Sequence, residues 1–253
     1  MSAKDILVKP IKSQIANDFV RKHHYSGKVV QNSQLHFGCF LNGILGGVMS
    51  FGPSLDKKKI MGLVKGTKFN DFLELNRMAF SDLLPRNSES RCISIALRLI
   101  KKHYPNIKWV ISFADGCQCG DGRIYRASGF KLTAIKPNSD CMQTELGGVV
   151  HTMTVKSSKS LMSKYGNWKE AMRGVYGDYK PLNGFQLRYI YFLDKSKEKD
   201  LTVPVLPYSK IYEMGAGMYK GKKRDLRVGL KENANQCANG GVIPTPTLHL
   251  VGA

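Results

Sequence analysis

Residues 72–130 run FLELNRMAF (72–80), SDLLPRNSES (81–90), RCISIALRLIKKHY (91–104), IKWVISFAD (107–115) and DGRIYRASGF (121–130). The first and fourth pieces are apolar runs of strand length. The third piece has apolar residues at helical spacing, at Ile93, Ala96, Leu97 and Ile100. The order strand, polar loop, helix, strand, helix predicts an α/β fold with a central mixed sheet flanked by helices.

The segments on either side extend this pattern. Ser13 is suited to cap a helix that ends near His23-His24-Tyr25, and Asn42-Gly43 is a strong two-residue hairpin signal. After residue 130 the apolar pattern returns several times, and Gln186–Leu193 is suited to rejoin the sheet as a last strand. The remaining strands are expected at 6–11, 35–41, 44–51, 130–135 and 149–155.

The polar loop before the main helix is a candidate phosphate site. A helix that begins at Asn87 or Ser88 exposes backbone N–H groups without partners, and such groups bind anions. Arg86 and Arg91 would neutralise negative charge, while Asn87, Ser88 and Ser90 would donate hydrogen bonds. The alternative is an ordinary capped helix with a solvated basic start.

The charge of the chain is strongly positive. The net charge is +20 and the pI is about 9.7, which favours a nucleic-acid partner over a small acidic substrate. No apolar run approaches the roughly 20 residues that a membrane span needs, and the N-terminus lacks a signal-peptide core. We therefore expect a soluble, cytoplasmic protein with no membrane partner. The six cysteines show no disulfide framework, and a zinc site using Cys141 is a minor alternative.

Composition also suggests a division of the chain. We expect a catalytic domain over 1–195 with a basic insertion at about 156–185, a basic extension over 196–231, and a disordered tail over 232–253. Candidate contacts with a nucleic-acid backbone are the lysine-rich stretch 57–68 and the run 220–224. The alternative for each of these lysines is a solvated surface without a specific role.

The order of elements over 72–130 resembles the cofactor half of the GNAT acetyltransferase superfamily. The resemblance implies a GNAT-like sheet in which strands 72–80 and 109–113 diverge to admit acetyl-CoA, with the pyrophosphate on residues 86–91. It places Tyr125 where the superfamily has a tyrosine that protonates the leaving thiolate. The chain lacks the Gly-x-Gly/Ala pair that is usual in the phosphate loop.

Four motifs together resemble the Mom family of phage DNA-modification proteins: KHHYSG (22–27), LELNRMAF (73–80), PRNSES (85–90) and FADG…GRIYRASGF (113–130). The resemblance implies an enzyme in a bacterial host that adds a carbamoylmethyl group to the exocyclic amine of adenine in DNA and so blocks restriction. It implies acetyl-CoA and iron as cofactors. Carried over by motif, the candidate iron ligands are His24, Tyr25, Asp115 and Tyr125.

The chemistry of these side chains permits that role. Imidazole, carboxylate and phenolate groups are reasonable iron ligands, and the competing role of Tyr125 is general acid, with Asp115 or Glu74 as base. Each residue also has a plain alternative: a helix-end histidine, an Asp-Gly turn, or a packed tyrosine. Arg77 lies in an apolar strand and needs an anion, which we expect to be Asp115, the cofactor or DNA phosphate.

The implied product poses a chemical problem. Simple acyl transfer from acetyl-CoA would join nitrogen to the carbonyl carbon, whereas a carbamoylmethyl group joins nitrogen to the former methyl carbon, for which a redox metal is a sensible requirement. Reaction at a base-paired amine also calls for base flipping in duplex DNA. Two rival functions stay open: a conventional N-acetyltransferase acting on a protein or small amine, and a non-catalytic DNA-binding protein with a GNAT-like fold.

Overall fold

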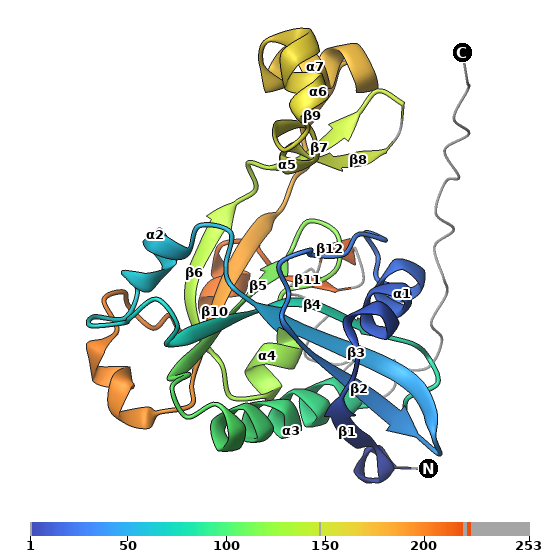
Figure 1. Ribbon diagram of the computed structural model, residues 1–253. Coiled ribbons are helices and arrows are strands. Elements are labelled where there is room, and N and C mark those ends of the chain that lie inside the picture. The colour runs from blue at the N-terminus through green and yellow to red at the C-terminus, as the bar shows by residue number, and fades with distance from the viewer. Residues whose placement is uncertain (1, 147, 220–221, 224–253) are drawn as a thin grey trace.

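A mixed seven-stranded sheet forms the centre of the computed structural model, which describes residues 2–146, 148–219 and 222–223. The strand order is β1-β2-β3-β4-β5-β10-β6 (Figure 1). Only β4 and β5 pair in parallel; the other neighbours are antiparallel. The strands are β1 (Leu7–Pro10), β2 (Leu35–Leu41), β3 (Ile44–Gly52), β4 (Phe72–Phe80), β5 (Trp109–Asp115), β6 (Lys131–Pro137) and β10 (Phe185–Phe192).

Helices cover both faces of this sheet. On one side, called here the α3 face, α3 (Ser88–His103) and α4 (Arg123–Ala127) bury apolar residues against Val110 and Ala114 of β5. On the other side, the α1 face, α1 (Ser13–His23) packs Ala16 and Val20 against β3 and β4, and α2 (Lys57–Met61) adds Ile60 and Met61 to a cluster around Trp109. Side chains alternate along β5, so Val110 and Ala114 face α3 while Trp109 and Ile111 face the opposite side.

Strands β4 and β5 separate soon after they meet. Their parallel pairing spans Phe72 to Glu74 on β4. Just beyond it, Ser50 pairs with Arg77 and Phe51 with Leu75, so Asn76 is the extra residue of a β-bulge. The bulge bends β4 while β5 stays paired with β10. A gap opens between the two strands, as the GNAT resemblance implied, and the fold is the expected mixed α/β sheet with helices on both sides.

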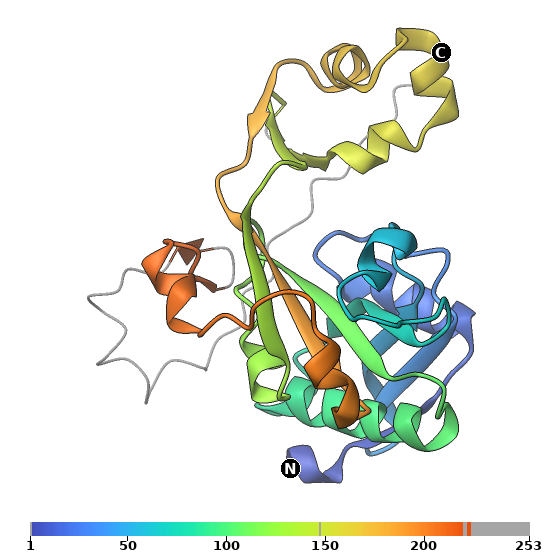
Figure 2. The ribbon, with the colours of Figure 1, turned by 90° about the vertical axis from the view of Figure 1, so that its left-hand side faces the viewer.

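A small lobe, residues 138–184, leaves the sheet between β6 and β10 (Figure 2). It has its own core of Met142, Val155, Ala171 and Met172. Its sheet contains β7 (Cys141–Thr144), β8 (Val149–His151) and β9 (Tyr179–Pro181), and its helices are α5 (Thr152–Lys156), α6 (Lys159–Tyr165) and α7 (Trp168–Tyr176). The basic insertion proposed at about 156–185 overlaps the later part of this lobe.

The last described segments are short. They are η2 (Lys195–Asp200), α8 (Ser209–Glu213), β11 (Met218–Tyr219) and β12 (Lys222–Lys223), and η1 (Ala3–Asp5) precedes β1. The proposed tail over 232–253 lies outside the described residues. Within the described ranges, no helix has the length and apolar character that a membrane crossing requires.

Two local predictions need correction. The strand expected over 149–155 stops at His151, because the imidazole Nδ1 accepts a hydrogen bond from Met153 N (3.1 Å) and starts α5 there. The cap of α1 is Lys12, which makes no side-chain cap hydrogen bond, so Ser13 is the first helical residue. The helix expected from Asn87 or Ser88, the hairpin at Asn42-Gly43 and the returning last strand are confirmed.

Candidate functional site

Tyr25 and Asp115 form the centre of the candidate site on the α1 face. The Tyr25 hydroxyl donates a hydrogen bond to Asp115 Oδ2 (3.1 Å), which joins the segment after α1 to the last residue of β5. Cys117 N donates to Asp115 Oδ1 (2.9 Å), and Gln118 Nε2 donates to Oδ2 (3.2 Å). The carboxylate is thus held by one donor from the segment after α1 and two from the turn after β5.

The proton of the Tyr25 hydroxyl is firmly held. Tyr25 is 50% exposed, yet loss of hydration around its hydroxyl, with Cys119 and Asp115 nearby, raises the pKa of Tyr25. Burial and the charge of Asp115 likewise raise the pKa of the Cys119 thiol to about 12. At neutral pH the hydroxyl therefore stays protonated and serves as a donor to the carboxylate.

His24 stands next to this pair as a neutral imidazole. Its ring lies 4.3 Å from the ring of Tyr25, between centroids, at an interplanar angle of 31°. Burial and the positive charge of Arg77 lower the pKa of His24 to about 4. Its Nδ1 accepts a hydrogen bond from Ser26 N (3.1 Å) and lies 2.8 Å from Ser26 Oγ. The remaining nitrogen, Nε2, is the one left for a ligand or a proton transfer.

Arg77 is tied to the backbone. Its Nε donates to Lys28 O (2.9 Å) and its Nη1 to Asn76 O (2.9 Å). The carboxylate whose charge acts on Arg77 is Glu74 and not Asp115, which was one of the three anions that we expected beside the cofactor and DNA phosphate. Burial raises the pKa of Glu74, and Arg77 partly opposes that rise. The bulge at Asn76 puts this cation beside His24 and Tyr25.

Tyr125 approaches the gap from the opposite side of the sheet. It belongs to the core of the α3 face, is 7% exposed, and packs against Phe130 and Tyr189. Its hydroxyl forms a hydrogen bond with Ser112, and burial raises the pKa of Tyr125 to about 12. The four expected iron ligands are therefore split: His24, Tyr25 and Asp115 gather on the α1 face, and Tyr125 lies on the α3 face.

The described residues contain no group of three or more His, Cys, Asp and Glu side chains that could hold a metal ion. A metal at this site would therefore have to take a tyrosine oxygen alongside His24 and Asp115. Cys117 and Cys141 form a hydrogen bond between their sulfurs, but two thiols without a further described ligand do not make a zinc site.

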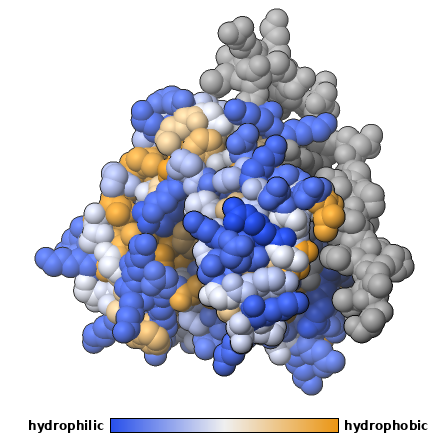
Figure 3. Space-filling model, turned by 90° about the horizontal axis from the view of Figure 1, so that it is seen from above, coloured by the Kyte–Doolittle hydropathy of each residue, from blue (hydrophilic) through white to orange (hydrophobic). Residues whose placement is uncertain are grey.

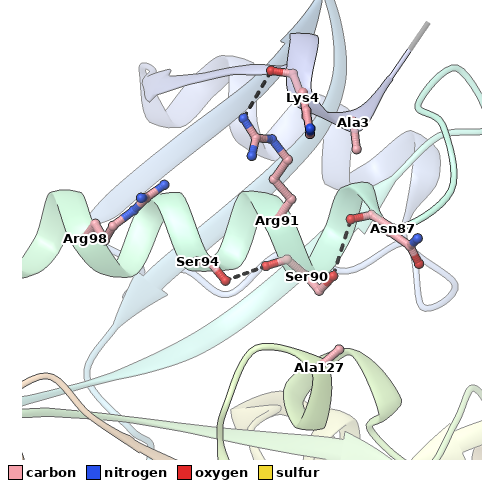
Figure 4. A pocket seen from close by; sticks show the side chains of 8 residues that line it. All are labelled: Ala3, Lys4, Asn87, Ser90, Arg91, Ser94, Arg98 and Ala127. Carbon is pink, nitrogen blue, oxygen red and sulfur yellow. Dashed lines mark hydrogen bonds between the residues drawn. The ribbon is translucent and has the colours of Figure 1, made fainter.

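A separate basic pocket of about 380 Å³ lies at the start of α3 (Figure 4). Asn87, the N-cap, has a left-handed backbone (φ 68°) and makes no side-chain cap hydrogen bond, so the first turn of α3 is not closed by its own cap. Arg91 Nη2 donates to Lys4 O (3.1 Å), which holds η1 over the pocket. The lining residues are Ala3, Lys4, Asn87, Ser90, Arg91, Ser94, Arg98 and Ala127.

Three of the five expected phosphate contacts line this pocket: Asn87, Ser90 and Arg91. Ser88 is buried and its hydroxyl donates to Pro85 O, so it is turned away from the pocket. Arg86 is exposed and does not line it. Lys4 and Arg98 also line the pocket and were not predicted. Arg98 is detectable from spacing, because it follows Arg91 by seven residues, or two helical turns.

Comparisons with known proteins connect this geometry to a family. The model of the Mom protein family matches residues 5–210. The protein called methylcarbamoylase mom, from Escherichia phage Mu, is 36% identical over 218 residues, which cover 82% of this chain and 85% of that protein.

Solved acetyltransferase structures are more distant. The IAA acetyltransferase from Bacillus cereus is 11% identical, with a TM-score of 0.41 over 74% of this chain and 99% of that one. The ribosomal-protein-S18-alanine N-acetyltransferase from Escherichia coli is 9% identical, with a TM-score of 0.41 over 74% of this chain and 94% of that one. A GNAT family acetyltransferase from Elizabethkingia anophelis, solved with acetyl-CoA, is 11% identical, with a TM-score of 0.39 over 74% and 98%.

Proposed function

The chain belongs to the Mom protein family, and from that premise we propose that it is a DNA-modification enzyme that adds a carbamoylmethyl group to the exocyclic amine of adenine, with acetyl-CoA as donor. The observation that carries the proposal is the gap between β4 and β5, which has Tyr125 on one side and the Tyr25–Asp115 pair on the other. A modified amine would no longer present the same donor to restriction enzymes, so the DNA would be protected.

Acetyl-CoA would bind from the α3 face. Its phosphates carry several negative charges, and the pocket at the start of α3 offers Lys4, Arg91 and Arg98 together with the open first turn of the helix. Tyr125 lies on the same face as this pocket, on α4 together with Ala127, which lines the pocket. We therefore place the pyrophosphate in the pocket and the thioester near Tyr125.

Tyr125 and Asp115 would divide the proton transfers. Tyr125 holds its proton up to a pKa of about 12, so it is suited to donate that proton to a leaving thiolate and unsuited to act as a base near neutral pH. The Asp115 carboxylate is oriented by hydrogen bonds from Tyr25, Cys117 and Gln118. It is placed to accept a proton from the adenine amine that reacts on the α1 face.

Iron is a further part of the proposal, because the product joins nitrogen to a former methyl carbon. That step breaks a methyl C–H bond and removes two electrons, which a co-substrate oxidant would have to accept, while an ammonia-level nitrogen donor would replace the thiolate at the carbonyl carbon. The side chains at this site offer atoms of the types that bind iron: the Nε2 of His24, the hydroxyl oxygen of Tyr25 and the carboxylate of Asp115. Iron would supply the redox chemistry that methyl activation requires. A bound cation would also lower the pKa of Tyr25 and so oppose the rise that burial causes.

Nucleoside mass spectrometry of DNA from cells that express the protein tests the activity. Native protein should add the mass of a carbamoylmethyl group to deoxyadenosine, and Tyr125→Phe and Asp115→Asn should lose it. Tyr104→Phe, which changes an exposed tyrosine beyond the end of α3, is the control and should retain it. An acetyl mass would favour ordinary acyl transfer, and unmodified DNA from folded native protein would contradict the proposal.

Metal analysis tests iron separately from activity. Purified native protein should contain iron, and Tyr25→Phe should contain several-fold less, with loss of any visible phenolate-to-iron absorption. Equal iron in the two proteins would contradict the assignment of Tyr25, even if DNA modification were retained.

A further inference from the structure

The lobe is attached to the sheet next to Asp115. Phe185 of β10 pairs with Pro137 of β6, so the chain leaves and re-enters the sheet at one point. The next residue of β10, Gln186, pairs with Asp115 at the end of β5. The base of the lobe therefore lies at the edge of the proposed reaction site.

Two contacts tie the lobe to opposite sides of that site. Gln118 Nε2 lies 3.2 Å from Asp115 Oδ2 and 3.9 Å from the sulfur of Cys141, in the first strand of the lobe. On the other side, Lys28 Nζ donates to Thr154 Oγ1 of α5 (2.9 Å). Lys28 comes soon after Tyr25 in the chain, so α5 reaches across from β5 to the segment after α1 (Figure 2).

The beginning of α5 faces the site. His151, its N-cap, is half-buried, and charged groups around it include Asp115, Asp140, Lys28 and Lys156. Met153, two residues later, is 40% exposed. This end of the lobe combines polar and apolar groups next to Tyr25 and Asp115, which suits contact with a nucleotide.

The outer helices of the lobe carry unneutralised lysines. Lys159 and Lys164 of α6 and Lys169 of α7 are exposed, and none of them forms an ion pair with a described carboxylate. By contrast, Lys156 pairs with Asp140 (3.7 Å) and Arg173 with Glu170 (3.0 Å). Hydrophilic residues dominate the view of the molecule from the side of the lobe (Figure 3). A partner at this surface is therefore expected to be polyanionic.

We infer that the lobe is a DNA-holding element, in which α6 and α7 contact the sugar–phosphate backbone while the start of α5 lies beside the target nucleotide. This inference rests on the proposed function and extends it to a part of the chain for which the family resemblance gives no role. On the α1 face, α2 offers a second group of lysines, Lys57, Lys58 and Lys59, to the same duplex. Backbone contacts of this kind position the DNA without reading its sequence.

The salt dependence of binding tests the lobe directly. The triple variant Lys159→Gln/Lys164→Gln/Lys169→Gln should bind duplex DNA more weakly than native protein, and the slope of log affinity against log salt should fall by roughly 2–3, since each lost phosphate contact reduces it by about 0.9. The control is Lys9→Gln/Lys101→Gln/Lys102→Gln, which removes the same charge from β1 and from the end of α3. Its slope should fall by less than about 1. Equal slopes for the two triples would overturn the inference.

Cross-linking gives a second readout that does not depend on affinity. A photo-reactive amino acid at Met153 should cross-link to bound duplex DNA, whereas the same residue at exposed Leu7 on β1 should not. Absence of cross-links at Met153 in a complex that forms would contradict the lobe's role. If native protein neither binds nor modifies DNA, the proposed function itself fails. If native protein modifies DNA and the lobe variants match their controls, only the lobe inference fails.

Discussion

The α3 face and the α1 face of the same sheet are built in different ways. On the α3 face, the pocket and Tyr125 come from one stretch of chain, 87–127, apart from the cover by η1. On the α1 face, the Tyr25–Asp115 hydrogen bond joins residues that are 90 positions apart. Tyr125 is 7% exposed and Tyr25 is 50% exposed. This difference agrees with the proposal of a preformed cofactor side on the α3 face and an acceptor side on the α1 face that stays open to a large substrate.

Asp115→Asn should give the largest effect, confined to the α1 face. The amide cannot accept a proton from the amine, and its NH₂ group would oppose one of the donors that now hold the carboxylate. General-base catalysis contributes 10²- to 10⁴-fold, so the rate of adenine modification should fall by about 10³-fold. Quantitative nucleoside mass spectrometry in single-turnover reactions measures it.

The control for Asp115→Asn is the binding of CoA, measured by calorimetry. The dissociation constant for CoA should change by less than about 2-fold, because the proposed pocket lies on the other face. A parallel loss of CoA affinity would show that the two faces are coupled and do not act as separate cofactor and acceptor sides.

Tyr125→Phe should have the next largest effect, on the α3 face. Loss of the proton donor should lower the rate by about 10²-fold. The ring still fills its place against Phe130 and Tyr189, and the lost hydrogen bond with Ser112 should cost about 1 kcal/mol of unfolding free energy. Thermal unfolding and the rate with a CoA thioester check both parts. An unchanged rate would assign Tyr125 to packing alone.

Arg91→Gln should weaken binding of CoA while leaving the acceptor side unchanged. A charge-assisted hydrogen bond contributes about 1.5–3 kcal/mol, so the dissociation constant should rise by about 10-fold or more. Arg86→Gln is the matched control, because Arg86 is exposed and does not line the pocket. If Arg86→Gln weakened CoA binding as much as Arg91→Gln, the phosphates would lie outside the pocket that we describe.

The contrast between the faces also explains what the sequence predicts well. The strand and the helix within residues 72–104 follow from local patterns, since alternation and helical spacing are properties of neighbouring residues. The positions of Asn87, Ser90 and Arg91 follow from the same stretch. Ser88 was misjudged because spacing does not reveal that its hydroxyl turns to Pro85 O and becomes buried.

The α1 face is harder to predict because it depends on contacts between distant segments. The motifs named Tyr25 and Asp115, but only the fold shows their hydrogen bond and the position of Arg77 beside His24. The bulge at Asn76, which aims Arg77, arises from the pairing of β3 with β4. The lobe was predicted only as a basic insertion, because its first strand, Cys141–Thr144, is too short to give a periodic signal.

The smallest effect is expected from Lys28→Met, which tests how firmly the lobe is held against the α1 face. The hydrogen bond from Lys28 Nζ to Thr154 Oγ1 is exposed, so it should contribute less than about 1 kcal/mol, and the melting temperature should fall by at most about 2–4 °C. Amide hydrogen exchange is the more informative measurement. Exchange in α5 should become faster, while exchange in α3 should not change, because α3 lies on the opposite face.

The control, Lys12→Met, removes an exposed lysine at the start of α1 and should leave α5 unchanged. Faster exchange in α3 as well would mean that the lobe and the α3 face open together, so that the two faces of the sheet would not be independent of each other.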